Sequence, residues 1–198
     1  MPTPMAAAIL RLFANLAEDL AARSIPEHSV HAYIFGGCAV HLHTAARASS
    51  DVDVEFCYDD LLMASAVRLV LQELPPVDYD DPDAGPSQLV WDANFNTTFG
   101  PLHEDYRDRA VLIEHVPGSP VDVWLPAAED IAVSKLGRFS DVDVEDIVEL
   151  LSLPTSNRDR FQMLAAEAGA YYVGQPLDSK ISYIRKLLDE KEGRHDLP

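Results

Sequence analysis

The sequence predicts a mixed α/β fold followed by a helical portion, and three observations support this fold class. Strand-type and helix-type patterns alternate along the first 126 residues. Some neighbouring strands in this part are joined by helices and others by tight turns, which favours a mixed sheet. Beyond Pro126 the pattern is helical. With 47% hydrophobic and 24% charged residues among 198, the composition is that of a globular protein.

The first predicted element is an amphipathic helix over residues 5–23, which Pro26 ends. Its apolar residues recur at spacings of three and four, as one buried helix face requires. A strand over residues 30–35 follows and stops at Gly36-Gly37, after which residues 38–46 return to a helical pattern. The apolar residues of the first helix are Ile9, Leu12, Phe13, Leu16 and Leu20.

A second strand is predicted over residues 51–56, where polar and apolar residues alternate, and a helix follows over residues 61–74. Residues 75–86 are rich in proline and aspartate and are therefore predicted to form an exposed loop. Further strands are predicted over residues 87–91, 110–116 and 121–125, the last two joined by the turn Pro117-Gly118-Ser119-Pro120. The later helices are predicted over residues 127–137, 142–153, 158–168 and 179–191. We therefore divide the chain into an α/β core, 1–126, and a helical portion packed on it, 127–198.

The chain is strongly acidic, with 33 Asp and Glu against 15 Lys and Arg, a formal net charge of −18. This charge disfavours tight non-specific binding of nucleic acid and suits a basic protein partner or a divalent cation. A tRNA would need a local basic patch, for which the candidates are Arg107, Arg109, Arg158 and Arg160.

The N-terminal segment has no basic leader and no run of ~20 apolar residues, so we expect a cytoplasmic protein without a membrane span. Cys38 and Cys57 lack the spacing of a metal site and are interpreted as reduced, buried thiols.

Two pairs of residues in the core suggest chemistry. Asp51 and Asp53 are two apart on a strand and so project from one face, where their repulsion can be offset by a hard cation such as Mg²⁺. A solvated strand face is the alternative. Gly36-Gly37 ends a strand and opens a helix, which leaves backbone amides free for a phosphate group, although such a pair can also be a simple turn.

The wider pattern resembles the nucleotidyltransferase superfamily with the DNA-polymerase-beta-like fold. The resemblance is carried by Gly36-Gly37, by Arg47-Ala48-Ser49-Ser50-Asp51-Val52-Asp53, and by the segment from Pro120 to Leu136 with Asp122 and Lys135. It is similar in particular to AbiEii-like nucleotidyltransferases of toxin–antitoxin and phage-defence systems, although Ser49 stands where those have threonine. It covers roughly residues 30–150.

The resemblance implies roles for individual residues. Asp51, Asp53 and Asp122 would be catalytic and would ligate two Mg²⁺ ions. Gly36, Gly37, Arg47, Ser49 and Lys135 would bind the nucleotide, although Lys135 could also be a surface helix lysine. Asp143 and Asp146, three apart on a predicted helix, would act as base or orienting group, or would form an acidic helix start.

The function implied is Mg²⁺-dependent transfer of a nucleoside monophosphate from an NTP to an acceptor hydroxyl, with release of pyrophosphate. The resemblance suggests a toxin that acts on tRNA or on a protein and is restrained by a cognate antitoxin. Two alternatives remain. One is a non-catalytic module that binds a basic protein through an acidic surface, and the other is an enzyme that modifies a small molecule such as an antibiotic.

Overall fold

The computed structural model describes residues 2–92, 94–114 and 118–195. It divides the chain into two compact units, each described by itself below. The first unit contains residues 1–96 and 110–126, and the second contains residues 97–109 and 127–198. Within the described ranges, no helix is long and apolar enough to cross a membrane.

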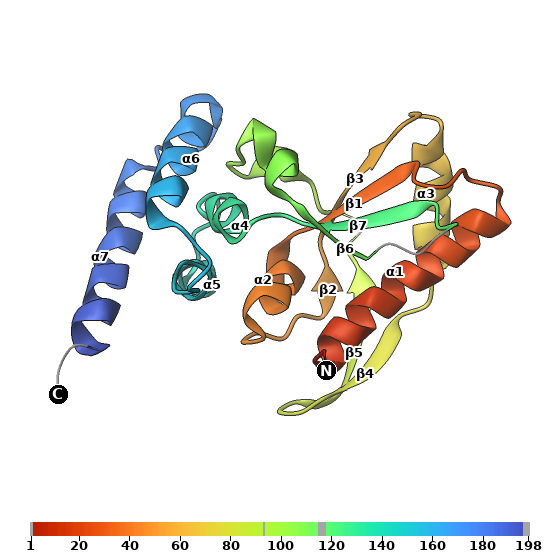
Figure 1. The fold of residues 1–198 in the computed structure, drawn as a ribbon, viewed down its shortest axis with the longest axis horizontal. Coiled ribbons are helices and arrows are strands. Elements are labelled where there is room, and N and C mark those ends of the chain that lie inside the picture. Colours follow the sequence, from red (N-terminus) through yellow and green to blue (C-terminus); the bar gives the residue numbers. More distant parts are fainter. Residues whose placement is uncertain (1, 93, 115–117, 196–198) are drawn as a thin grey trace. The chain divides into compact units, whose positions relative to one another are not determined.

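The first unit is built on a mixed sheet (Figure 1). Its strands are β1 (Val30–Ile34), β3 (Val54–Tyr58), β6 (Val111–Glu114) and β7 (Val121–Leu125), in the order β3-β1-β7-β6. The pair β1 and β7 is parallel, whereas β3 and β6 run antiparallel to their neighbours. The predicted mixed sheet is thus confirmed. The last two residues of the predicted strand 110–116 and the first residue of the turn 117–120 lie outside the described residues.

Helix α1 (Pro4–Ala22) covers one face of this sheet (Figure 1). Its predicted apolar stripe is buried, and Phe13 together with Ala14 borders Val121 and Val123 of β7. Thr3 caps the helix by accepting a hydrogen bond from the Ala6 amide. Side chains alternate along a strand, so His31, Tyr33 and Asp122 point to the other face.

Three further strands form a second, smaller sheet in the order β2-β5-β4. They are β2 (Asp51–Val52), β4 (Val77–Asp81) and β5 (Gly85–Trp91). Helices α2 (Gly36–Thr44) and α3 (Met63–Glu73) complete the unit. The predicted strand 51–56 is therefore interrupted at Asp53, and its two parts belong to different sheets.

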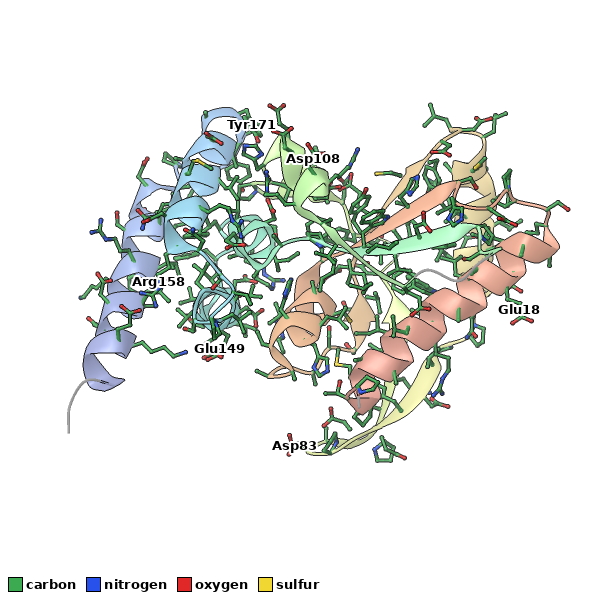
Figure 2. The ribbon with its side chains drawn as sticks, in the orientation of Figure 1. Glu18, Asp83, Asp108, Glu149, Arg158 and Tyr171 are labelled. Carbon is green, nitrogen blue, oxygen red and sulfur yellow. The ribbon has the colours of Figure 1, made fainter. Side chains whose placement is uncertain are left out.

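The prediction of an exposed loop over residues 75–86 is wrong. Residues 77–81 pair antiparallel with residues 85–89, as a hairpin. Val77 is buried, and the Asp81 carboxylate accepts hydrogen bonds from the amides of Asp83 and Ala84, which closes the turn before Gly85. Figure 2 shows Asp83 at the end of this hairpin. The aspartates therefore form the turn instead of breaking the structure.

The second unit is helical. It contains the 3-10 helices η1 (Thr97–Phe99) and η2 (Glu104–Arg109), followed by α4 (Ala128–Lys135), α5 (Asp141–Leu151), α6 (Arg158–Tyr171) and α7 (Asp178–His195). The four α-helices agree with the predicted ones to within a few residues. Two buried acids tie the unit together, because Asp130 accepts two hydrogen bonds from Arg109 and Glu129 accepts one from Arg160.

Candidate active site

Three carboxylates meet at one edge of the first unit. One oxygen each of Asp51, Asp53 and Asp92 lies within 4.8 Å of the others. Asp51 belongs to β2, Asp53 follows it, and Asp92 follows β5, which runs parallel to β2. Carboxylates this close repel one another, and a hard cation with oxygen ligands offsets that repulsion. The donor set therefore fits a divalent metal ion such as Mg²⁺.

Asp92 is absent from the sequence prediction. It is held in place by backbone pairing, since its amide donates to the Val52 carbonyl at 3.1 Å, and its carboxylate accepts from the Asn94 amide at 2.7 Å. The signal in the sequence was its position directly after a predicted strand. The carboxyl ends of parallel strands meet at one edge, but the sequence does not show that β5 lies beside β2.

The glycine pair comes into direct contact with these carboxylates. Gly36 has a φ of +59°, and a Cβ atom there would lie 1.6 Å from Oδ2 of Asp53. A Cβ atom at Gly37 would lie 2.8 Å from the Ser49 hydroxyl and 3.5 Å from the Arg47 guanidinium carbon. Both positions therefore require glycine for close approach, and Gly36 also requires it for its backbone conformation.

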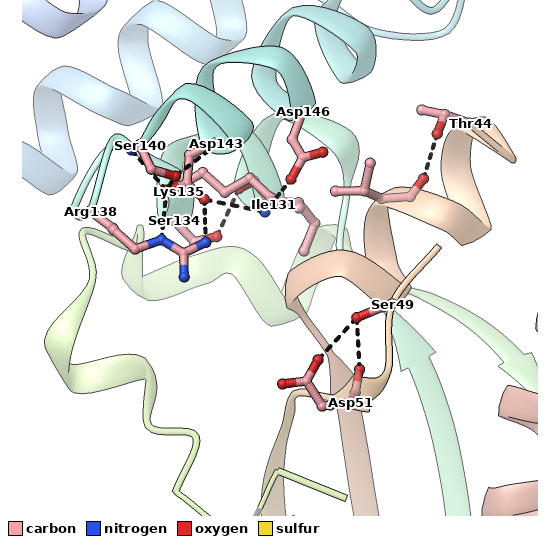
Figure 3. A network of polar contacts seen from close by, with 11 residues as sticks. Thr44, Ser49, Asp51, Ile131, Ser134, Lys135, Arg138, Ser140, Asp143 and Asp146 are labelled. Carbon is pink, nitrogen blue, oxygen red and sulfur yellow. Dashed lines mark hydrogen bonds and ion pairs between the residues drawn. The ribbon is translucent and has the colours of Figure 1, made fainter. Parts of the chain in front are cut away.

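Ser49 orients Asp51 through a short local contact. Its hydroxyl lies 3.1 Å from both Oδ1 and the backbone carbonyl of Asp51 (Figure 3). The structure thus brings together six residues that the sequence analysis grouped: Gly36, Gly37, Arg47, Ser49, Asp51 and Asp53.

The loop that carries Arg47 is anchored by a buried histidine. The His41 ring contacts the Arg47 carbonyl through Nδ1 and the Thr3 hydroxyl through Nε2, the latter at 2.6 Å. His41 therefore connects the cap of α1 to the loop before Asp51, which gives it a structural role.

The pKa of the Cys38 thiol is affected by the negative charge of the nearby carboxylates. Burial, together with the nearby charges of Asp53 and Asp51, raises the pKa of this thiol to about 12. The thiol donates a hydrogen bond to the Asp51 carbonyl at 3.2 Å. Cys38 is thus a protonated, buried thiol beneath the carboxylate strand, as the sequence predicted for a reduced cysteine.

Asp122, the third carboxylate in the sequence prediction, lies elsewhere on the sheet. It pairs in register with His31, whereas Asp53 is level with Phe35, whose amide donates to the Asp53 carbonyl. Four residues of strand, about 13 Å, separate these levels. Asp122 is buried and lies 2.9 Å from Nδ1 of His28 and 3.7 Å from Nδ1 of His31. The structure therefore places Asp122 with two histidines and Asp92 with the carboxylate pair.

Lys135, Asp143 and Asp146 form a buried cluster within the second unit (Figure 3). The Lys135 ammonium lies 2.7 Å from Asp146 and 3.7 Å from Asp143. With only 6% of its surface exposed, Lys135 is not the surface lysine that the sequence allowed as an alternative. Its charge is balanced by the two acids that the sequence considered as base or orienting groups.

Asp143 is the most heavily bonded of these acids. Its carboxylate accepts two hydrogen bonds from Arg138, both at 2.7 Å, and it forms a capping box with Ser140 at the start of α5. Burial alone would raise the pKa of Asp143, but Arg138, Ser140 and Lys135 outweigh it and hold the pKa well below its usual range. Asp143 thus fulfils the acidic helix-start role.

The arginines considered for a tRNA patch are largely paired with acids. Arg109 binds Asp130, Arg160 binds Glu129 and Arg158 binds Glu192. Arg107 stacks over the Tyr106 ring at 5.4 Å. Internal pairing reduces the positive charge that these side chains can offer to a polyanion.

Comparison with known proteins places these residues in context. A family profile described as nucleotidyltransferase of unknown function (DUF6036) matches residues 9–185. No curated protein matches the chain in sequence.

Two similar solved structures are of the antibiotic-resistance factor ANT(2'')-Ia. The solution structure has a TM-score of 0.45 at 12% identity, covering 96% of this chain and 99% of the other. The crystal structure with adenylyl-2''-tobramycin has a TM-score of 0.47 at 15% identity, covering 82% and 98%.

Proposed function

Because the chain belongs to the DUF6036 family of nucleotidyltransferases, we propose that it transfers a nucleoside monophosphate from an NTP to an acceptor hydroxyl group, with Asp51, Asp53 and Asp92 as its carboxylate set. The approach of these three acids beside the glycine turn is the observation that carries the proposal. In the reaction, the acceptor hydroxyl gives up its proton to solvent, its oxygen bonds to the α-phosphorus, the bond from that phosphorus to the β-phosphate oxygen breaks, and pyrophosphate leaves.

The acids suit this reaction electrostatically. Bound Mg²⁺, two ions in the reaction type proposed, supplies positive charge to the phosphates, and the three carboxylates would hold it. The residues around them have separate tasks. Ser49 fixes the orientation of Asp51, and the absence of side chains at Gly36 and Gly37 lets Asp53 and Ser49 pack against the start of α2, whose backbone amides would face the phosphates. Arg47 lies beside Gly37 and would add a positive charge there.

Lys135 is the further cation proposed for the phosphates. The Asp146 and Asp143 carboxylates hold its ammonium, so contact with phosphate would require an exchange of partners. Replacing Lys135 by methionine should therefore raise the KM for the NTP if that exchange occurs.

The kind of acceptor is proposed from the net charge of the chain and from the resemblance of one segment to toxins. The segment 47–53 resembles toxin nucleotidyltransferases, which supports a toxin restrained by a cognate antitoxin. A net charge of −18 and the pairing of Arg109, Arg158 and Arg160 with acids favour a protein hydroxyl over tRNA.

The test is incubation of the purified protein with each α-³²P-labelled NTP and Mg²⁺, separately with cellular protein, total RNA and an aminoglycoside antibiotic. Label should enter protein with the natural chain and be lost with Asp53→Ala. Label in RNA or antibiotic would reassign the acceptor while retaining the transfer reaction. A folded Asp53→Ala variant with full activity would remove the carboxylate set from the proposal.

A matched pair of variants tests the third carboxylate. Asp92→Asn should abolish Mg²⁺-dependent NTP binding in calorimetry, because it removes a charged ligand of the cluster. Asp122→Asn should retain that binding, because Asp122 lies about 13 Å along the sheet from the level of Asp53. The opposite result in two folded variants would restore Asp122 as the third ligand, as the sequence predicted.

A further inference from the structure

An apolar groove with an acidic wall runs between α5 and α7 in the second unit. Its volume is about 410 Å³. Val144 and Val148, one helical turn apart on α5, face Leu187 of α7 across it. These side chains are only partly covered by the chain itself. The groove thus offers apolar contacts in a row, as a bound helix needs.

The wall formed by α5 is acidic on its exposed side. Asp141, Glu145 and Glu149 are exposed there, and α5 contains no basic residue. Glu190 adds a carboxylate from α7 and lies 3.7 Å from Lys186, as Glu149 lies 3.2 Å from Lys191, so the rim has four acids and two lysines. Figure 2 shows Glu149 on this helix. The rim therefore has an excess of negative charge around an apolar floor.

The charge distribution selects the kind of partner. A second copy of the chain would bring another net charge of −18 to an already acidic rim, so self-association here is opposed by repulsion. A cationic amphipathic helix fits both features, since its apolar side chains can occupy the groove and its Lys or Arg residues can pair with the rim.

We infer that the α5–α7 groove is a docking site for a basic amphipathic helix of another protein. The acids that face inward from α5, Asp143 and Asp146, hold Lys135 and leave the outward side of the helix to the partner. The groove belongs to the second unit and shares no residue with the carboxylate set of the first, and the inference does not depend on the acceptor.

The experiment uses the full chain and a fluorescent 15-residue peptide designed as an amphipathic helix, with leucines on one face and lysines beside them. A scrambled peptide of equal composition is the control. Anisotropy should show saturable binding of the designed peptide and weaker binding of the scrambled one. Val148→Asp and Glu145→Lys should each weaken binding about tenfold or more.

Matched variants in the first unit distinguish docking in the groove from non-specific electrostatic attraction and non-specific hydrophobic binding of the peptide. Asp83→Lys makes the same change of charge as Glu145→Lys, but in the exposed hairpin turn. Leu69→Asp replaces an apolar residue by aspartate, as Val148→Asp does, but on the exposed face of α3. Both should bind the peptide like the natural chain.

Three results would overturn the inference. They are the absence of saturable binding, equal weakening by Asp83→Lys and Glu145→Lys, or a dimer in sedimentation that Val148→Asp dissociates. Circular dichroism would verify that each variant is folded. Because Glu145 is exposed, Glu145→Lys should fold and provides the test even where Val148→Asp does not fold.

Discussion

At the scale of single residues, the site depends on close approach between backbone and carboxylate. Gly36 lies against Asp53 with a left-handed backbone, so any side chain there must displace an acid. A substitution at Gly36 therefore has two unfavourable effects, backbone strain in the left-handed region and a steric clash with Asp53. Gly85 is a control for the backbone strain alone, because it has a φ of +77° and open space around it.

We therefore expect Gly36→Ala and Gly85→Ala to differ in function more than in stability. Each should lose about 1 kcal/mol from the left-handed backbone. Only Gly36→Ala should also lose Mg²⁺-dependent NTP binding, because the added methyl group displaces Asp53. Thermal unfolding and calorimetry on both variants would measure this. Equal NTP binding by the two would mean that Asp53 can move without consequence.

The residues of the candidate site were predictable only where they are close in sequence. Asp51 and Asp53 share a segment with Ser49 and Arg47, and the resemblance of that segment to the nucleotidyltransferase pattern grouped them. Asp92 follows strand β5 and Asp122 lies within strand β7. Only the pairing of these strands with their neighbours decides which of the two acids lies beside Asp51 and Asp53. Register between distant strands depends on tertiary packing, which no local pattern encodes.

At the scale of elements, the capping box at α5 determines how the helix begins. Asp143 accepts hydrogen bonds from Ser140 and Arg138 and lies near Lys135, so one carboxylate ties together the helix start and two cations. The same bonds lower its pKa. The group contributes to stability at any pH above about 4, the value of an unfolded aspartate, and the contribution is lost as the pH falls through the lowered pKa.

Asp143→Asn should consequently destabilise the protein by about 2–4 kcal/mol at pH 7, since it removes the buried carboxylate that pairs with Arg138 and leaves Lys135 with Asp146 alone. The difference from the natural chain should shrink as the pH falls below about 4. Urea unfolding between pH 3 and pH 7 would follow it. A constant difference across that range would mean that hydrogen-bond geometry, and not charge, stabilises the start of α5.

Helices were easier to predict than the hairpin. The stripe of α1 and the helices after Pro126 follow from periodicity within a short window. The β4–β5 hairpin escaped prediction because prolines and aspartates dominate its composition. Its pairing rests instead on the burial of Val77 and Leu89 and on the turn that the Asp81 carboxylate closes.

At the scale of the whole molecule, the excess of acidic residues opposes compactness. Charges of one sign repel more strongly in the folded chain than in the expanded unfolded chain. Partly buried pairs such as Arg109 with Asp130 are screened little by salt, whereas exposed carboxylates are screened strongly.

The melting temperature should therefore rise by a few degrees between about 0.05 and 0.5 M NaCl, as the Debye length shrinks. Scanning calorimetry at constant pH would measure it, with the uncharged osmolyte sucrose at equal osmolality as the control. A melting temperature that falls with salt would show that attractive surface pairs, such as Arg23 with Glu73, outweigh the general repulsion.

The path of the chain between its two units limits how the protein can be divided. Residues 97–109 leave the sheet between β5 and β6, cluster with the helices, and return at residue 110. A fragment that begins at residue 127 would keep Asp130, which is fully buried, but lose Arg109, its bidentate partner. A single cut therefore leaves an uncompensated interior charge, and an isolated helical unit would need residues 97–109 grafted onto its N-terminus.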